Sequence, residues 1–166
     1  MTSYSERALT AWHSRIGSVE GVGAWHTIDQ AQINAFADAT LDHQFIHIDP
    51  ERAAAQSPYK VTIAHGFLTL SLLPHLVSSA LSPEPALTEG VTAAINYGLD
   101  RVRFPSPVKV GSRVRARSEL LAVEAVGPNT LQLKRRVTFE IEGAEKPGCV
   151  AESLSRLVYG AEPPKP

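Results

Sequence analysis

Several features that mark specialised proteins are scarce in this chain of 166 residues. It contains one cysteine, Cys149, which cannot form a disulfide within the chain and therefore fits a reducing compartment. No apolar h-region marks a signal peptide, and no long apolar span marks a membrane helix. Lysine and arginine together number 16 against 17 aspartates and glutamates, so no basic excess favours nucleic acid or acidic lipid. We expect a cytoplasmic protein that binds neither nucleic acid nor membranes.

What is present is the composition of an ordinary globular domain. Hydrophobic residues make up 43% of the chain, and its length lets one core bury most of the apolar surface. The sequence has no internal repeat or low-complexity segment. We expect a helical extension over residues 1–22, one domain over residues 23–160, and a flexible tail over residues 161–166.

The N-terminal third has the patterns of short helices. Apolar residues at helical spacing predict an amphipathic helix over residues 5–15. A short strand is predicted over residues 25–28. Asp29 then follows as an N-cap, with Gln32 in the position that completes a capping box, and a helix is predicted over residues 30–39.

The next segment alternates irregular and helical patterns. Residues 40–48 have no sustained period and are predicted to form a loop. Asp49 followed by Pro50 marks the start of a helix over residues 50–55, because proline is favoured at the first helical position. Residues 63–79 are almost wholly apolar, so we expect one long helix that is buried on most of its circumference.

The second half has the period-two pattern of strands. After a predicted linker over residues 82–90, apolar and polar residues alternate in runs at residues 99–104, 113–117, 131–142 and 149–159. Turn signals separate these runs at residues 105–107, 127–129 and 146–148, which favours hairpins over crossovers. The fold class is therefore predicted to be α+β, with one long helix followed by an antiparallel sheet.

Polar residues are concentrated just before the long apolar helix. Asp42 and His47 are five residues apart, and His65 and Gly66 lie where the apolar run opens. An isolated pair of this kind most often has a structural role, with the aspartate capping a turn and the histidine bonded in a loop. A metal site built from Asp42, His43, His47, Asp49 and His65 is a second possibility.

Three motifs together resemble a known family. The run Asp42-His43-Gln44-Phe45-Ile46-His47, the later Ala53, and Ile63-Ala64-His65-Gly66 are similar to the MaoC-like, R-specific enoyl-CoA hydratases, also called hydratase 2. The resemblance covers roughly residues 23–159 and is greatest to the NodN-like branch. Gln44-Phe45 stands where the usual hydratase pattern has Asn-Pro, and the spacing from Asp42 to His47 is the same as in that pattern.

The resemblance implies a fold and an assembly. Members of this family have a single hot-dog domain, in which a curved antiparallel sheet wraps a long central helix. They generally pair, so we expect a homodimer with the active site near the interface. No metal and no separate cofactor are implied, because coenzyme A, or an acyl-carrier protein, arrives as part of the acyl-thioester substrate.

The same resemblance implies roles for individual residues. Asp42 and His47 are expected to hold the catalytic water and share the proton transfers, and the Gly66 N–H is expected to stabilise the oxyanion. Further candidates for substrate binding are Gln44, His65, Phe67, Asn96 and Arg103. His65 is equally expected to serve as an N-cap or turn residue. Adding water to a trans-2-enoyl thioester, or the reverse dehydration, is the predicted reaction.

Two other functions remain open at this stage. A hot-dog thioesterase needs a carboxylate on or beside the central helix, and residues 67–81 contain none. A non-catalytic subunit that binds an acyl thioester does not need both Asp42 and His47. Arginines alternate with other residues at positions 101, 103, 113, 115 and 117. They could bind the phosphates of coenzyme A or of an acyl-carrier protein, or they could form the solvated face of a sheet, which is the interpretation we favour.

Overall fold

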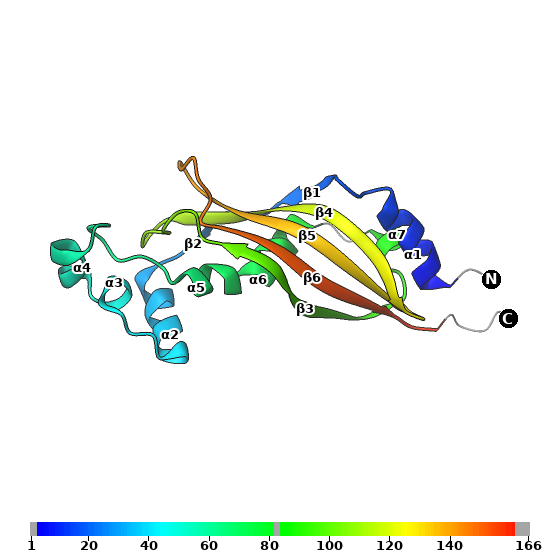
Figure 1. The fold of residues 1–166 in the computed structure, drawn as a ribbon, viewed down its shortest axis with the longest axis horizontal. Coiled ribbons are helices and arrows are strands. Elements are labelled where there is room, and N and C mark those ends of the chain that lie inside the picture. The colour runs from blue at the N-terminus through cyan, green and yellow to red at the C-terminus, as the bar shows by residue number, and fades with distance from the viewer. Residues whose placement is uncertain (1–2, 82–83, 162–166) are drawn as a thin grey trace.

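The computed structural model describes residues 3–81 and 84–161 (Figure 1). Its helices are α1 (Tyr4–His13), α2 (Gln30–Thr40), α3 (Phe45–Ile48), α4 (Pro50–Gln56), α5 (Gly66–Ser71), α6 (Leu73–Ala80) and α7 (Pro85–Thr88). Its strands are β1 (Val19–Val22), β2 (His26–Thr27), β3 (Val91–Arg103), β4 (Arg113–Gly127), β5 (Thr130–Ile141) and β6 (Cys149–Tyr159). Among these residues, no helix combines the length and the apolarity needed to cross a membrane.

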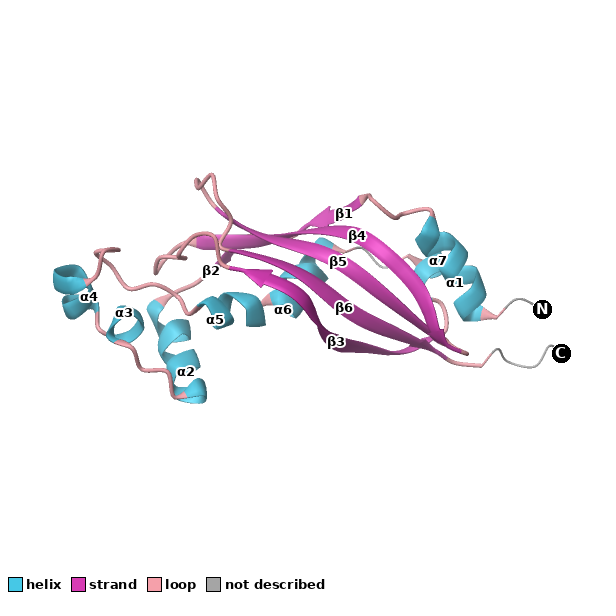
Figure 2. Ribbon diagram, viewed as in Figure 1, coloured by secondary structure: helices cyan, strands magenta, loops and turns pink. Residues whose placement is uncertain are grey.

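One antiparallel sheet forms the body of the molecule. Its strand order is β1-β4-β5-β6-β3, and β2 also pairs with β4. The sheet curves around α5 and α6, while α2, α3 and α4 lie at one end and α1 and α7 at the other (Figures 1 and 2). The predicted α+β class is confirmed, because a helix along the inner face of a curved sheet lets both bury apolar side chains.

Two of the three predicted hairpins form. The turns at residues 127–129 and 146–148 connect β4 to β5 and β5 to β6, and these neighbours pair along their length. The third prediction is wrong, because β3 pairs with β6 and not with β4. Residues 105–107 therefore begin a connection that passes to the far side of the sheet, and β3 is an edge strand.

The predicted helix over residues 63–79 is shorter and interrupted. Residues just before Gly66 are held in extended backbone, since Ile63 pairs with Lys109 and the Ala64 N–H bonds to the Val108 carbonyl. Pro74 has no N–H to donate to the carbonyl one turn earlier, so α5 ends at Ser71 and α6 begins at Leu73.

The same helical segment is less buried than the sequence suggests. Only Leu68, Thr69 and Leu76 are buried along α5 and α6, and Phe67 is 70% exposed. The expectation of burial around most of the circumference is wrong for the single chain. Part of the apolar surface instead lines a cavity under the sheet.

Other boundaries differ in smaller ways. Residues 85–88 of the predicted linker form α7, and residues 82–83 lie outside the described part of the chain. Strand β1, which sequence reasoning did not anticipate, pairs with β4. The tail after residue 161 is also outside the described residues, and β6 has the bounds that the alternation predicts.

Two buried clusters form the core. The first joins α2, α5 and α6 to the sheet and includes Ile33, Leu76 and Phe139. Cys149 belongs to this cluster, and burial raises the pKa of its thiol to about 12. The second cluster joins α1 and α7 to the other end of the sheet through Trp12.

Candidate active site

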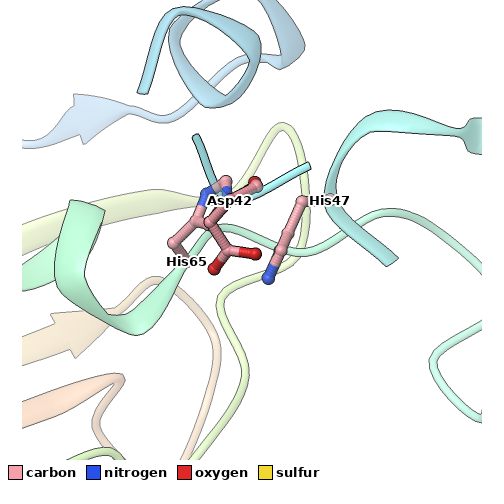
Figure 3. A group of neighbouring side chains, drawn as sticks. All are labelled: Asp42, His47 and His65. Atoms are coloured by element: carbon pink, nitrogen blue, oxygen red, sulfur yellow. The ribbon is translucent and has the colours of Figure 1, made fainter. Parts of the chain in front are cut away.

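Asp42, His47 and His65 come together beside the start of α5. One polar atom from each side chain lies within 4.8 Å of the others, and the three side chains converge in Figure 3. Both histidines are buried, whereas Asp42 is exposed to solvent. A carboxylate at the mouth of a buried pair of rings is a geometry in which one water molecule can contact several polar groups.

The predicted loop that carries Asp42 and His47 is partly helical. Helix α2 continues to Thr40 and ends with Leu41 in the left-handed region, and residues 45–48 form the single turn α3. The loop prediction for residues 40–48 is therefore wrong at both ends. The two bends place Asp42 between the helices and His47 on the inner side of α3.

His47 has a tautomer that follows from its hydrogen bond. Its Nδ1 lies 2.7 Å from the Ile63 carbonyl oxygen, which can only accept a hydrogen bond, so Nδ1 carries the proton. The lone pair of the neutral ring is therefore on Nε2. Orienting a histidine through one nitrogen so that the other can act as a base is the usual arrangement for proton transfer.

His65 holds the Asp42 backbone. Its Nε2 donates to the Asp42 carbonyl oxygen at 2.9 Å, and its ring stacks on that of His47 with centroids 3.7 Å apart. The Nδ1 of His65 is buried and has no hydrogen-bond partner among the described residues. His65 also occupies the N-cap position of α5, although its side chain makes no capping bond. Its ring thus ties together the three segments of the site.

Burial is the main influence on His47. Desolvation lowers the pKa of the imidazole below its ordinary value of 6.5, because the charged form loses hydration. The bond to the Ile63 carbonyl opposes this shift, the neighbouring His65 adds to it, and Asp42 opposes it. The net direction is downward, so the ring is neutral and able to accept a proton at neutral pH.

A residue that sequence reasoning missed supports the His47 backbone. The side-chain amide of Gln30, at the start of α2, donates to the His47 carbonyl oxygen at 2.7 Å. The same amide oxygen accepts a hydrogen bond from the Thr62 hydroxyl. Nothing in the sequence around Gln30 signals this contact, because its partners are 17 and 32 residues away.

The capping prediction next to Gln30 is half right. The Asp29 carboxylate accepts from the Gln32 N–H at 2.8 Å, as an N-cap does. The Gln32 side chain, however, bonds to His26 and does not complete the capping box. The Asp49 prediction is confirmed, since its carboxylate caps α4 with Pro50 in the first turn.

Gly66 is the first residue of α5 and lies against an aromatic ring. A Cβ atom placed on it would approach the ring carbons of Phe104 to 3.1–3.2 Å, which is tighter than ordinary contact. No acceptor for the Gly66 N–H is present within residues 3–81 and 84–161. The glycine therefore leaves an unbonded backbone donor at a helix start, close to the histidine pair.

The remaining predicted substrate residues lie on different elements of the fold. Gln44 is the exposed residue that precedes α3, and Phe67 is exposed with its ring edge toward Phe104 at a centroid distance of 6.0 Å. Arg103 is exposed at the end of β3. Asn96 lies on β3 and lines the cavity under the sheet.

The geometry is poorly suited to a metal ion. His43 pairs with Asp38 and Asp49 caps α4, so neither belongs to the cluster. The rings of His47 and His65 are stacked within 24° of parallel. Because a histidine lone pair lies in the ring plane, two stacked rings direct their lone pairs side by side and not toward one ion. The cluster fits a bound water better.

The alternating arginines belong mainly to a solvated sheet face. Arg113 pairs with Glu142 and Arg115 with Glu140 across the β4–β5 ladder. These contacts have the form of cross-strand ion pairs, the first exposed and the second half-buried. They agree with the reading of this strand as the solvated face of a sheet.

A cavity of about 1080 Å³ lies between the sheet and α6. It begins at Leu70 and Ser71, about one helical turn beyond Gly66, and reaches Trp12 of α1 and Leu87 of α7. The cavity thus runs from near the candidate site toward the opposite end of the molecule. Its volume suits a small-molecule ligand.

Comparison with known proteins identifies the family. The model of the MaoC like domain matches residues 13–140. The chain belongs to the MaoC-like dehydratase family. It is 55% identical over 142 residues to 3-hydroxyacyl-thioester dehydratase Z of Mycobacterium tuberculosis, covering 86% of this chain and 90% of that protein. It is 51% identical over 154 residues to nodulation protein N of Rhizobium leguminosarum bv. viciae, covering 93% of each.

Solved structures agree with this MaoC-like assignment. R-hydratase PhaJ1 from Pseudomonas aeruginosa superposes with a TM-score of 0.62 at 24% identity, covering 99% of this chain and 95% of that one. At this identity the likeness establishes the fold. The predicted hot-dog fold and the resemblance to the MaoC-like family and to its NodN-like members are both confirmed.

Proposed function

We propose that this chain adds water to trans-2-enoyl thioesters to give R-3-hydroxyacyl thioesters, and catalyses the reverse dehydration. The observation that carries the proposal is the convergence of the Asp42 carboxylate with a ring nitrogen of His47, a ring whose Nε2 is unprotonated. The names of the relatives support it, since 3-hydroxyacyl-thioester dehydratase Z and R-hydratase PhaJ1 both describe this class of lyase.

The reaction needs a base, an acid and an oxyanion donor. His47 Nε2 removes a proton from the water, and the water oxygen forms a bond to the β-carbon of the enoyl group. The π electrons move onto the thioester oxygen, where the Gly66 N–H stabilises the enolate charge. A proton from the Asp42 and His47 pair then returns to the α-carbon. The net reaction adds one water molecule across the double bond. It therefore needs no cofactor.

We further propose that the active form is a homodimer that joins two copies of β3. This strand pairs with β6 on one side only, so its other edge has unpaired backbone groups. Ile95, Tyr97 and Leu99 are 47%, 52% and 43% exposed along it. Pairing with another strand would satisfy the backbone groups of this edge and cover its apolar side chains. Pairing here would also bring the partner chain close to the cavity.

The proposal is tested with crotonyl-CoA, whose absorbance falls as its double bond is hydrated. We expect Asp42→Asn and His47→Gln each to lower kcat/KM by about a hundredfold or more, the usual contribution of a proton-transfer group. His43→Gln is the matched control, because His43 bonds to Asp38 outside the cluster. Full activity in Asp42→Asn or in His47→Gln would contradict the proposed roles of these residues.

The two alternative functions predict different products. A thioesterase would release free coenzyme A from a saturated acyl-CoA, yet α5 and α6 carry no aspartate or glutamate to activate water. A non-catalytic subunit would leave both substrates unchanged. We expect hydration of the enoyl thioester and no free thiol from the saturated one. Testing the same enoyl chain on coenzyme A and on an acyl-carrier protein identifies the carrier.

A further inference from the structure

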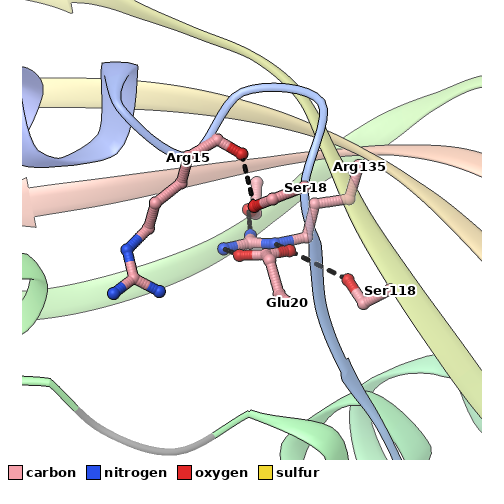
Figure 4. Close-up of polar contacts among 6 residues, drawn as sticks. Arg15, Ser18, Glu20, Ser118 and Arg135 are labelled. Carbon is pink, nitrogen blue, oxygen red and sulfur yellow. Dashed lines mark hydrogen bonds and ion pairs between the residues drawn. The ribbon is translucent and has the colours of Figure 1, made fainter.

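The far end of the cavity is polar, although its walls are mainly apolar. There Arg135 of β5 meets Glu20 of β1, with side chains only 10% and 5% exposed (Figure 4). Arg135 Nε lies 2.8 Å from one carboxylate oxygen and its second terminal nitrogen lies 3.1 Å from the other. Ser118 also donates to Glu20. Both charged residues line the cavity.

The Arg135 guanidinium has donors left over. It has five N–H groups, of which two bond to Glu20 and one to the Ser155 hydroxyl. The other two make no hydrogen bond among the described residues. The Trp12 ring lies 5.3 Å from the guanidinium carbon. A pair with a purely structural role would be expected to satisfy its donors within the protein.

The charges around this end of the cavity cancel. Besides Arg135 and Glu20, the lining includes Arg15 and Glu84, which form a second ion pair. Two positive and two negative groups leave no net charge to attract an ion. Ser155 and Asn96 add neutral hydrogen-bonding groups to the same cavity. The chemistry that fits here is therefore a neutral group that accepts hydrogen bonds.

The polar end lies a defined distance from the candidate active site. Strand β1 passes against the end of α6, since a Cβ on Gly21 would overlap the Ala80 carbonyl oxygen. From Gly66 to Ala80, α5 and α6 span about 21 Å at about 1.5 Å per residue. Between these points the wall of the cavity includes Leu73 and Val77. An acyl chain that runs along α6 meets hydrocarbon first and Arg135 last.

We propose that the cavity takes the tail of the acyl chain, and that Arg135 and Glu20 select chains with a neutral oxygen group, such as a hydroxyl or keto group, at the far end. This inference rests on the proposed function and specifies its substrate class. A plain hydrocarbon end that reaches Arg135 displaces water and leaves two donors unbonded. A hydroxyl at the same place accepts from them.

The test compares trans-2-enoyl-CoA substrates of three lengths, octenoyl, dodecenoyl and hexadecenoyl, each with and without an ω-hydroxyl. We expect the ω-hydroxyl to raise kcat/KM about tenfold at the length that reaches Arg135, and to lower it at shorter lengths, where the hydroxyl is buried among leucines. Preference for the plain chain at every length overturns the inference. Crotonyl-CoA tests the proposed function separately, because its chain is too short to reach the pair.

Variants tie the preference to the ion pair. Replacing both partners, Arg135→Leu with Glu20→Leu, leaves no unpaired charge, and we expect the plain chain to be preferred. Arg136→Leu with Glu119→Leu is the matched control, because this ion pair also joins two strands, here β5 and β4, but its side chains are 44% and 31% exposed. If the double variant fails to fold, Arg135→Lys keeps the charge and removes the fixed donor geometry. An unchanged preference in these variants overturns the inference.

A binding measurement makes the result independent of turnover. Saturated palmitoyl-CoA and ω-hydroxypalmitoyl-CoA are titrated into the wild-type protein by calorimetry. We expect the hydroxylated ligand to bind about tenfold more tightly, and equal binding counts against the polar end as a selective site. A protein that shows this preference but hydrates no enoyl-CoA would refute the proposed function while retaining the binding site.

Discussion

At the scale of a single residue, the protonation of His47 is expected to set how activity depends on pH. Its pKa is lowered mainly by burial, so the Nε2 lone pair persists as the pH falls past 6.5. We expect the acid limb of a plot of kcat/KM against pH, which reports the free enzyme, to have its midpoint below 6.5. A midpoint at or above the ordinary histidine value would contradict the role of His47 as base.

The same shift affects stability. An unfolded chain has a histidine pKa near the ordinary value of about 6.5, so below that pH the unfolded state binds a proton that folded His47 resists. The free energy of unfolding therefore falls as the pH drops from about 6.5 through the lower folded pKa. Urea titrations at pH 7 and pH 5 measure it, with His47→Gln as the control that loses less stability over this range.

His65 is expected to position other groups without reacting. In His65→Phe the ring can still stack on His47, but the bond to the Asp42 carbonyl is lost. We expect kcat to fall about tenfold, with little change in KM for a short enoyl-CoA. His75→Phe is the control, since this exposed histidine lies on α6. Unchanged kcat in His65→Phe would show that the Asp42 backbone needs no support.

Residues of this site differ in how well the sequence reveals them. Asp42, His47 and Gly66 stand in motifs whose spacing resembles that of the family. Gln30 stands in no motif, because its contacts to His47 and Thr62 depend on how α2 packs against α3. Local spacing carries information about neighbours in the chain, whereas the contacts of Gln30 depend on the fold.

At the scale of the element, the start of α5 has little room for a side chain. We expect Gly66→Ala to lower kcat about tenfold, because its Cβ approaches the Phe104 ring and shifts the backbone donor. Phe104→Ala removes the obstruction, so the double variant should recover most of the loss. If Phe104→Ala gives no recovery, the cause lies elsewhere than in that contact.

Strand and helix patterns were predicted better than pairing. The bounds of β6 and the start of α4 follow from alternation and from the Asp49-Pro50 signal. Alternation shows which side chains share a face of a strand. It does not show whether β3 pairs with β4 or with β6, because either pairing can keep the apolar side chains on the same face of the sheet. The pairing of β3 with β6 therefore could not be predicted from local sequence.

At the scale of the whole molecule, the proposed dimer depends on the exposed edge of β3. We expect Ile95→Lys with Leu99→Lys to raise the dimer dissociation constant at least tenfold, because the dimer would bring four lysine charges together along the paired strands. Val126→Lys is the control, since Val126 on β4 is 41% exposed. Sedimentation velocity measures the change, and a wild-type protein that is monomeric at every concentration contradicts the proposed dimer.

The cavity is the least predictable feature at this scale. Its volume of about 1080 Å³ depends on how far the sheet stands from α6. The leucines of α5 and α6 would have the same sequence pattern in a fully packed core. The contact between Glu20 of β1 and Arg135 of β5 also depends on the arrangement of the strands, because the two residues are 115 positions apart in the chain.

The burial of Cys149 has a practical consequence for redox chemistry. Nucleophilic attack on a disulfide requires a thiolate, and a thiol with a pKa of about 12 forms almost none at neutral pH. The folded protein is therefore expected to resist alkylation, glutathione adducts and oxidation to a sulfenic acid. For the same reason, we expect no thiol–disulfide exchange between Cys149 and the oxidised disulfide form of coenzyme A. Any colour from a thiol reagent added to the native protein and a thioester then comes from released coenzyme A.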